Sequence, residues 1–212
     1  MKAKVLYIYD EIERFSDEDY ARLYSTLPGD IRNKRDSYKQ PIDRKLSLLG
    51  YCALRYALRR ECGVEEFGIE VEENGKPFFA ESGLPCFNIS HCKAGVSVAL
   101  HTQEIGVDIE EKSSYSEDLA QYTMSQGEVA AIGRSVDRQT AFAELWTKKE
   151  AYCKCTGHGL RDDLKTVLET MAEPVEFHSV YGQNYVVTVC TKTIDSILLN
   201  PVKVRVADLL SG

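Results

Sequence analysis

The chain has 212 residues and carries 33 Asp and Glu against 26 Lys and Arg, a formal net charge of −7. Hydrophobic residues make up 43% and charged residues 28%, which is typical of a globular protein and excludes a disordered one. The acidic balance argues against general nucleic-acid binding, and no apolar run approaches the roughly 18 residues of a membrane span. We expect a cytoplasmic monomer that binds neither nucleic acid nor a membrane.

The first half of the chain combines strands with two helices. Ser16 before three consecutive acidic residues is an N-cap pattern, and leucine and alanine recur at helical spacing after Pro41. The expected elements are a strand over 4–9, a helix from Ser16 to Pro28-Gly29, a helix from Pro41 to Gly63, and strands over 69–72, 95–100 and 105–110.

The second half repeats this order around one long helix. Asp137 is its N-cap, and Gly157 follows its last turn. Because strands, one long helix and more strands occur twice, the sequence predicts an α+β fold with two similar lobes, residues 1–104 and 105–212. The expected elements are a helix over 138–156 and strands over 175–181, 185–190 and 197–206.

The seven cysteines include no Cys-x-x-Cys pair. This favours reduced thiols over a secreted disulfide framework. Cys153, Cys155 and His158 do not predict a zinc site, because side chains two residues apart on a helix point about 200° apart. We interpret these cysteines as small packing residues.

Residues 106–110, Gly-Val-Asp-Ile-Glu, form the first candidate site. In a strand, Asp108 and Glu110 lie on one face, about 6.6–6.8 Å apart. Two such carboxylates can hold one hard cation, with water or phosphate oxygens completing its shell. The same alternation also fits a half-buried edge strand whose polar face lies in water.

The second candidate is residues 145–154, Leu-Trp-Thr-Lys-Lys-Glu-Ala-Tyr-Cys-Lys. Glu150 and Lys154 share one helix face, which by itself indicates a surface ion pair worth only about 0.3–0.5 kcal/mol. Trp146 lies four residues before Glu150. A carboxylate beside a large apolar ring favours the edge of a cleft.

The third candidate is residues 87–91, Phe-Asn-Ile-Ser-His. Ser90 and His91 do not form a nucleophile–base pair, because neighbouring strand residues point to opposite sides and no Gly-x-Ser-x-Gly elbow is present. At a strand end they can donate hydrogen bonds to a phosphate, and Lys76, on a turn stiffened by Pro77, adds a positive charge. P-loop and Gly-x-Gly-x-x-Gly motifs are missing.

Taken together and in this order, these segments resemble the Sfp-type (surfactin-type) 4′-phosphopantetheinyl transferases. Each motif is weak singly, but several in order with compatible spacing are specific, and the resemblance spans about residues 30–165. The matching segments are Gly75-Lys-Pro77, residues 87–91, 106–110 and 145–154, Gly157-His-Gly-Leu160, and the helix entry from Asp43 to Gly50.

The resemblance implies a pseudo-twofold pair of α+β lobes with coenzyme A in the cleft between them. The lobe 1–104 would bind coenzyme A, and the lobe 105–212 would hold the metal, perform catalysis and dock the carrier protein. The implied reaction moves 4′-phosphopantetheine from coenzyme A onto a serine of an acyl or peptidyl carrier protein and releases adenosine 3′,5′-bisphosphate.

The resemblance also implies roles for individual residues. Asp108, Glu110 and Glu150 would hold Mg²⁺ against the pyrophosphate, and Glu150 or a metal-bound water would take the serine proton. Lys154 would stabilise charge on the phosphate or protonate the leaving group. The residues expected to contact coenzyme A are Lys34, Ser47, Lys76, Pro77, Ser90, His91, Lys149 and Lys154.

Two positions depart from the family's pattern. His158 stands where the family often has a lysine in a Gly-x-Gly turn, so the charge there titrates around neutrality. Residues 121–128 lack the aromatic pair that usually precedes the Ser-x-x-Glu stretch, which leaves the carrier-facing region less defined.

Three other functions stay open from the sequence. A Mg²⁺-dependent coenzyme A pyrophosphohydrolase would carry a dense acidic helix motif that is not found here. A non-catalytic carrier-binding module would have no need of three acidic positions and Lys154. A metal-free structural domain leaves the co-occurrence of the motifs unexplained.

Overall fold

A computed structural model of the chain describes residues 4–157, 164–192 and 201–211, without the side chains of Lys4, Asp30 and Lys34. Its helices are α1 (Asp17–Ser25), α2 (Gly29–Asp36), α3 (Pro41–Cys62), α4 (Glu117–Thr123), α5 (Gln126–Arg134), α6 (Arg138–Thr156) and α7 (Val206–Leu210). Its strands are β1 (Lys4–Tyr9), β2 (Ile69–Val71), β3 (Pro77–Phe79), β4 (Cys86–Cys92), β5 (Gly95–His101), β6 (Ile105–Glu111), β7 (Glu176–Tyr181), β8 (Tyr185–Thr191) and β9 (Val202–Lys203).

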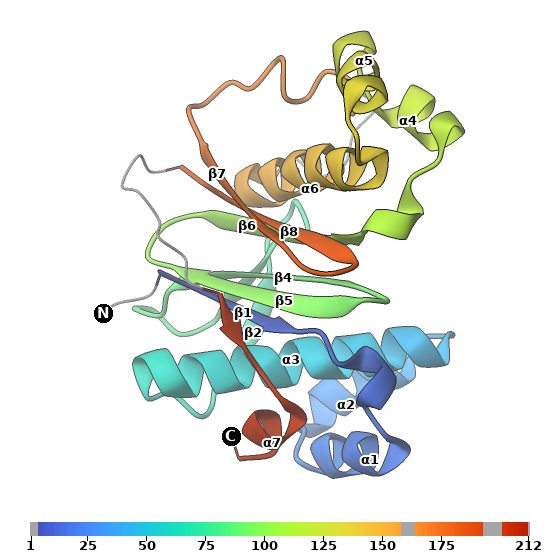
Figure 1. Cartoon of the computed structure of the whole chain (residues 1–212). Helices are drawn as coiled ribbons and strands as arrows, with labels where there is room; N and C mark the ends of the chain where they lie inside the picture. The colour runs from blue at the N-terminus through green and yellow to red at the C-terminus, as the bar shows by residue number, and fades with distance from the viewer. Residues whose placement is uncertain (1–3, 158–163, 193–200, 212) are drawn as a thin grey trace.

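The fold is α+β and is built in layers, as Figure 1 shows. Helix α3 covers a four-stranded sheet in the order β4-β5-β1-β9, and α6 covers a three-stranded sheet in the order β6-β8-β7. The two sheets pack face to face between the two helices, and β2 pairs with β3 in a separate hairpin. No helix in the described part of the chain is long and apolar enough to span a bilayer.

Alternation along the strands assigns their side chains to the layers. On β1, Tyr7 and Tyr9 enter the core beneath α3, whereas Leu6 and Ile8 enter the core between the sheets. On β6, Val107 and its apolar neighbours two residues away also point between the sheets. The alternate residues of β6 therefore face α6. The polar face of this strand is covered by a helix, not by water.

Gly106 allows α6 to pack directly on β6. A Cβ atom at this position would lie 2.0 Å from the Ala151 carbonyl oxygen and 2.4 Å from the Cys155 nitrogen. Both are backbone atoms of α6 and have no freedom to move alone. The close approach brings the α6 residues around position 150 against the carboxylates of β6.

Gly106→Ala is expected to destabilise the protein by at least ~2 kcal/mol, because overpacking against backbone forces the helix away from the sheet. Thermal unfolding would show a melting temperature lower by about 4–8 °C. Gly133→Ala on α5 is the matched control, since its added Cβ meets no atom within 4 Å; it should stabilise the protein by about 0.5 kcal/mol. Equal melting temperatures for the two variants would contradict the packing described here.

The sequence patterns predict the long helices and most strands correctly, but they do not predict the short helices α2, α4 and α5. The first helix ends at Ser25, and Pro28 is the N-cap of the unpredicted helix α2. Helices α4 and α5 were not predicted, although Ser116 and Ser125 cap them, the latter in a capping box with Glu128. In such short helices the caps are a stronger signal than hydrophobic periodicity.

The end of the chain returns to the first sheet. Of the strand expected over 197–206, residues 193–200 lie outside the described residues, and β9 covers only Val202–Lys203. This strand runs parallel to β1, with Tyr7 opposite Val202 and Ile8 opposite Lys203. Residues 202–210 thus pack on the first half of the chain, whereas the sequence division groups them with the second half.

Candidate functional site

Asp108 lies at the centre of a buried polar cluster between β4, β6 and α6. Its Oδ1 accepts a hydrogen bond from the Ser90 hydroxyl at 2.7 Å and an ion-paired hydrogen bond from Lys154 Nζ at 2.5 Å. Lys154 Nζ also donates to Ser90 Oγ at 3.1 Å. The Asp108 residue is only 5% exposed. Through these bonds, three motifs that are far apart in the sequence meet at one buried carboxylate.

The second carboxylate oxygen of Asp108 has no such partner. Oδ2 is buried and accepts no hydrogen bond from any described residue. A buried acceptor without a donor is costly. Its position beside other acidic groups indicates a place for a cation or a ligand donor.

Glu150 and Glu110 extend this cluster of acids. Burial, followed by the nearby Asp108 charge, raises the pKa of Glu150 to about 7, although the Lys154 ammonium acts against this rise. Burial also raises the pKa of Glu110, whose Oε1 accepts hydrogen bonds from Ser114 Oγ at 2.7 Å and from the Glu111 nitrogen at 2.8 Å. The Asp108 charge contributes to the rise in pKa of both glutamates, and a bound cation would offset such repulsion between carboxylates.

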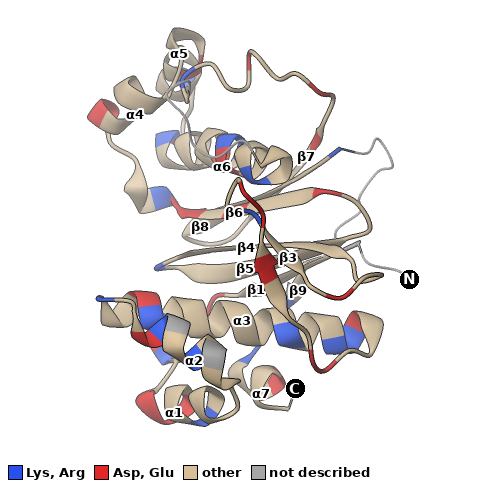
Figure 2. Cartoon of the chain, turned by 180° about the vertical axis from the view of Figure 1, so that it is seen from behind, with Lys and Arg blue, Asp and Glu red and all other residues tan. Residues whose placement is uncertain are grey.

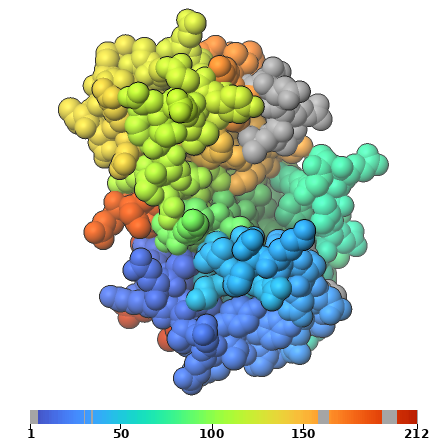
Figure 3. Space-filling model, turned by 90° about the vertical axis from the view of Figure 1, so that its right-hand side faces the viewer, coloured from blue at the N-terminus to red at the C-terminus, as the bar shows by residue number. Residues whose placement is uncertain are grey.

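A cavity of about 360 Å³ opens beside this cluster. Figure 3 shows the molecule hollowed between the blue helices of the first half, the yellow-green and yellow helices α4–α6, and the teal β2–β3 hairpin. The cavity is lined by the hairpin turn, by β4 and by the last turns of α6. Its lining residues are Asn74, Gly75, Lys76, Pro77, Asn88, Ile89, Glu150, Cys153, Lys154 and Gly157.

Lys76 reaches this cavity from the turn between β2 and β3. The Asn74 side-chain oxygen accepts a hydrogen bond from the Lys76 backbone nitrogen at 2.9 Å. The Lys76 ammonium donates to the Cys155 carbonyl at 2.9 Å and forms an ion pair with Glu104. The lysine is therefore fixed at both ends.

His91 follows Ser90 on β4 and is exposed. Desolvation by surrounding protein atoms, and then the Lys154 ammonium, lower the pKa of His91, while Asp43 at the start of α3 acts in the opposite sense. A neutral imidazole still carries one N–H donor. Ser47, also on α3, is half-buried.

Of the eight predicted coenzyme A contacts, Lys76, Pro77 and Lys154 line the described cavity, whereas Ser47, Ser90, His91 and Lys149 are not among its lining residues. Lys149 is fully buried, and its ammonium binds Glu128 at 2.6 Å, the Leu164 carbonyl at 2.8 Å and the carbonyls of Thr123 and Lys165. This environment leaves no exposed surface for a ligand. The side chain of Lys34 and all of His158 lie outside the described residues.

The environment of Trp146 also differs from the expectation. Its ring stacks on Phe142 with centroids 6.0 Å apart, within the apolar cluster formed by α4, α5 and α6. Trp146 therefore contributes to the core behind α6. The rise in the pKa of Glu150 comes from general burial and from neighbouring carboxylates.

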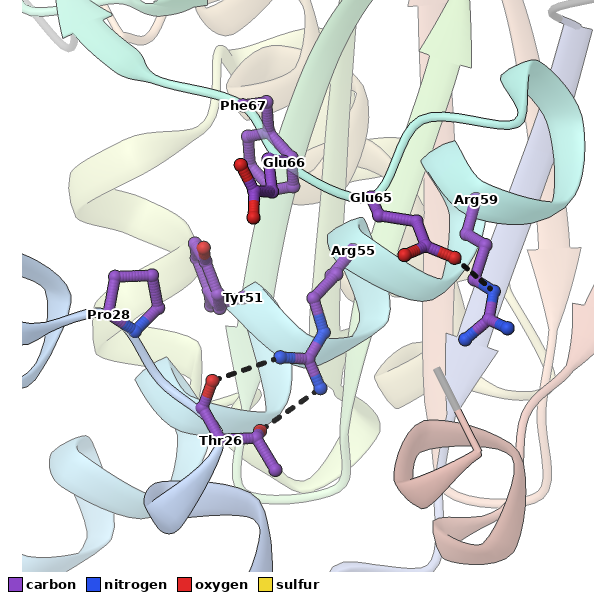
Figure 4. Close-up of a pocket in the computed structure, with 8 residues that line it drawn as sticks. All are labelled: Thr26, Pro28, Tyr51, Arg55, Arg59, Glu65, Glu66 and Phe67. Carbon is purple, nitrogen blue, oxygen red and sulfur yellow. Dashed lines mark hydrogen bonds and ion pairs between the residues drawn. The ribbon is translucent and has the colours of Figure 1, made fainter.

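A larger cavity of about 520 Å³ lies between α3, the α1–α2 connection and the segment before β2, and none of the predicted site residues lines it. Figure 4 shows that Arg55, Arg59 and Glu65 in this cavity already have partners. Arg55 donates to the Thr26 carbonyl and hydroxyl oxygens, and Arg59 pairs with Glu65 at 3.4 Å. The smaller cavity, which adjoins the Asp108 cluster, is therefore the candidate site.

The acidic residues suit a hard divalent cation by donor type. Mg²⁺ prefers carboxylate, water and phosphate oxygens as ligands. Asp108 Oδ2, which accepts no hydrogen bond from a described residue, is one such oxygen. Among residues 4–157, 164–192 and 201–211, no three His, Cys, Asp or Glu side chains lie close enough to form a metal site by themselves. Lys154 occupies the acidic cluster in this arrangement.

Two site residues were missed from the sequence. Asn88 Oδ1 accepts a hydrogen bond from the Val107 nitrogen at 2.9 Å, which sets β4 against β6 next to Asp108. Glu104 pairs with Lys76 from the loop between β5 and β6. Asn88 lies within a motif that had been singled out, whereas no local pattern marks Glu104.

Comparison with known proteins gives a consistent family. Residues 104–196 match the family model described as the 4′-phosphopantetheinyl transferase superfamily. The chain is 32% identical over 170 residues to 4′-phosphopantetheinyl transferase HetI of Nostoc sp., covering 74% of this chain and 71% of that protein.

Other relatives carry similar names. The chain is 31% identical over 149 residues to 4′-phosphopantetheinyl transferase Sfp of Bacillus subtilis, covering 68% of this chain and 66% of the relative. It is 28% identical over 205 residues to the L-aminoadipate-semialdehyde dehydrogenase-phosphopantetheinyl transferase of Saccharomyces cerevisiae, covering 81% and 74%. The matches span 63–66% of the length of three Bacillus relatives, just under two thirds.

Proposed function

The chain belongs to the 4′-phosphopantetheinyl transferase superfamily, and we propose that it transfers 4′-phosphopantetheine from coenzyme A to a serine of an apo acyl or peptidyl carrier protein. The second product is adenosine 3′,5′-bisphosphate. The observation that carries this proposal is the bonding of Asp108 and Ser90 to Lys154, which lines a cavity together with Glu150. This arrangement provides both cationic and anionic groups beside space for a ligand.

Coenzyme A would occupy this cavity, with its phosphates toward the basic groups. Lys76, Pro77 and Lys154 line the space, and Ser90 lies within hydrogen-bonding distance of Lys154. His91 and Ser47 would contact the ligand at the side of α3. Lys34 is retained from the resemblance alone, and Lys149 is not carried into the proposal because it is enclosed.

Asp108, Glu110 and Glu150 would hold Mg²⁺. This assignment is supported by Asp108 Oδ2, which accepts no hydrogen bond from a described residue, and by the raised pKa values of Glu110 and Glu150. When bound, the cation would neutralise charge on the pyrophosphate and polarise it toward attack. Lys154 would then exchange its bond with Asp108 for one with a phosphate oxygen.

The serine hydroxyl of the carrier would attack the phosphorus that bears pantetheine. A new oxygen–phosphorus bond forms, and the bond from that phosphorus to the bridging oxygen breaks, leaving its electron pair on the bisphosphate. The Glu150 carboxylate, which lines the cavity, would take the serine proton as the general base. Lys154 stabilises the charge that develops on the phosphate.

The names of the relatives favour transfer over the alternatives. Those reported above are phosphopantetheinyl transferases, and none is named a pyrophosphohydrolase or a binding module. The full set of Asp108, Glu110, Glu150 and Lys154 supports catalysis over binding alone. We assign no carrier pathway.

The remaining features belong to the same proposal. One helix on each sheet, α3 and α6, supports two lobes related by a pseudo-twofold axis. All seven cysteines are free thiols, which supports a reducing, cytoplasmic location. We expect the protein to act as a monomer, a point that size-exclusion chromatography with light scattering would check.

Intact-mass analysis of apo-carrier proteins tests the function. Incubation with the protein, coenzyme A and Mg²⁺ should add one phosphopantetheine group to the carrier, and chelation of the metal by EDTA should stop this gain. A carrier in which the acceptor serine is replaced by alanine is the control. Cleavage of coenzyme A without a change in carrier mass would instead show a hydrolase.

A further inference from the structure

Glu104 ties together several elements around the cavity. It lies in the loop between β5 and β6, and its carboxylate pairs with the Lys76 ammonium and accepts a hydrogen bond from Cys86 Sγ at 3.8 Å. Its carbonyl oxygen accepts a hydrogen bond from Cys155 Sγ at 3.5 Å. One loop residue thus contacts the hairpin turn, the start of β4 and the end of α6.

These contacts fix the hairpin against α6. Figure 2 shows the hairpin strand β3 and its acidic turn running in front of both sheets toward α6. The turn residues 74–77 form one wall of the 360 Å³ cavity, and Glu150, Cys153, Lys154 and Gly157 belong to the opposing wall. Lys76 links the turn to α6 through the Cys155 carbonyl and to the β5–β6 loop through Glu104.

The geometry of the ammonium explains why this link helps ligand binding. A lysine ammonium has three N–H donors. Glu104 and the Cys155 carbonyl accept two of them, which leaves one to point elsewhere. The Lys76 side chain is only 9% exposed, so an anchored ammonium presents its third donor with little loss of conformational entropy on binding.

We propose that Glu104 is a positioning residue for coenzyme A: it holds Lys76 so that the remaining N–H meets a phosphate oxygen of the ligand. The inference rests on the proposed function, because it assumes that coenzyme A fills this cavity. Glu104 itself touches no reacting atom. The Glu104 carboxylate is negative, so its direct electrostatic effect on the affinity for an anionic ligand is unfavourable. Its positioning of Lys76 is expected to raise that affinity, so the two contributions have opposite signs.

Glu104→Ala is expected to raise both the dissociation constant and the KM for coenzyme A about tenfold, since coupled pairs of this kind contribute in that range. The turnover number should change less than threefold, because the residue acts on binding shared by ground and transition states. Isothermal titration calorimetry with coenzyme A and Mg²⁺, without a carrier, measures the affinity independently of transfer.

Glu73→Ala is the matched control, because Glu73 is an exposed acid on the same hairpin. Its loss removes the same charge but leaves Lys76 anchored, so the affinity for coenzyme A should stay equal or rise. In a double-mutant cycle, Glu104→Ala should cause no further loss of affinity once Lys76→Ala is present. Glu104→Ser provides the same comparison if the alanine variant does not fold.

The outcomes separate the two proposals. If wild-type protein neither binds coenzyme A nor modifies a carrier, the proposed function fails. If wild type does both, but Glu104→Ala binds coenzyme A as well as wild type or more tightly, Glu104 contributes only charge and the inference is overturned. Additive effects of Glu104→Ala and Lys76→Ala would overturn it equally.

Discussion

Asp108→Asn is expected to lower the rate of phosphopantetheine transfer about 100- to 1000-fold, the loss seen when a preorganised charged group is removed from a reacting centre. The amide has nearly the same shape, but it lacks the charge that pairs with Lys154 and would bind a cation. Initial rates of carrier modification at constant Mg²⁺ measure the effect. Circular dichroism and thermal unfolding check that the variant remains folded.

The control for this substitution is Asp118→Asn. Asp118 is an exposed carboxylate on α4, so the same change in charge should leave the transfer rate within about twofold, as expected for a surface position. Transfer by Asp108→Asn at the wild-type rate and the same Mg²⁺ concentration would remove Asp108 from the catalytic site.

Lys149→Met is expected to cost about 3–5 kcal/mol of folding free energy, because it leaves the partner of a buried ion pair without its counter-charge. Glu128 and three backbone carbonyls lose their donor at once. Thermal unfolding should show a melting temperature lower by roughly 10 °C. Methionine fills a similar volume, so the loss reports the missing ammonium more than a cavity.

The neighbouring lysine provides the comparison. Lys148 pairs with Glu144 on the same helix at 2.6 Å, with both side chains partly exposed. Lys148→Met should therefore cost only about 0.5 kcal/mol. A drop in stability of the same size in both variants would show that the burial of Lys149 does not set its importance.

These two lysines show that helical periodicity predicts the helix but not which of its lysines is buried. Helical periodicity predicts α6 and places Glu150 and Lys154 on one face, and both line the cavity. It does not tell which of Lys148 and Lys149 is buried, because the partner that encloses Lys149 comes from α5. That helix is short and was not predicted, so its Glu128 had no assigned position.

The strand β6 also shows what a local sequence pattern predicts and what it does not. Its alternation correctly places Asp108 and Glu110 on one face, opposite the apolar residues. Alternation alone cannot identify what covers the polar face, and the answer, α6, begins about 30 residues later at Arg138. Similarly, the Lys76–Glu104 pair joins a turn and a loop that have no periodic pattern. Such pairs follow from the packing of whole elements.

The pairing of β9 with β1 determines when the four-stranded sheet can be completed during synthesis. β1 is synthesised before β5 and β9, and β5 pairs with one of its edges. Among the described residues, its other edge bonds β9 and the following Val204, and Lys203 and Tyr185 both contact Asp10 just after β1. This edge therefore stays open until residues 202–204 have been synthesised, and an open strand edge is a template for aggregation. The sheet that α3 covers is thus complete only after β9 has joined it.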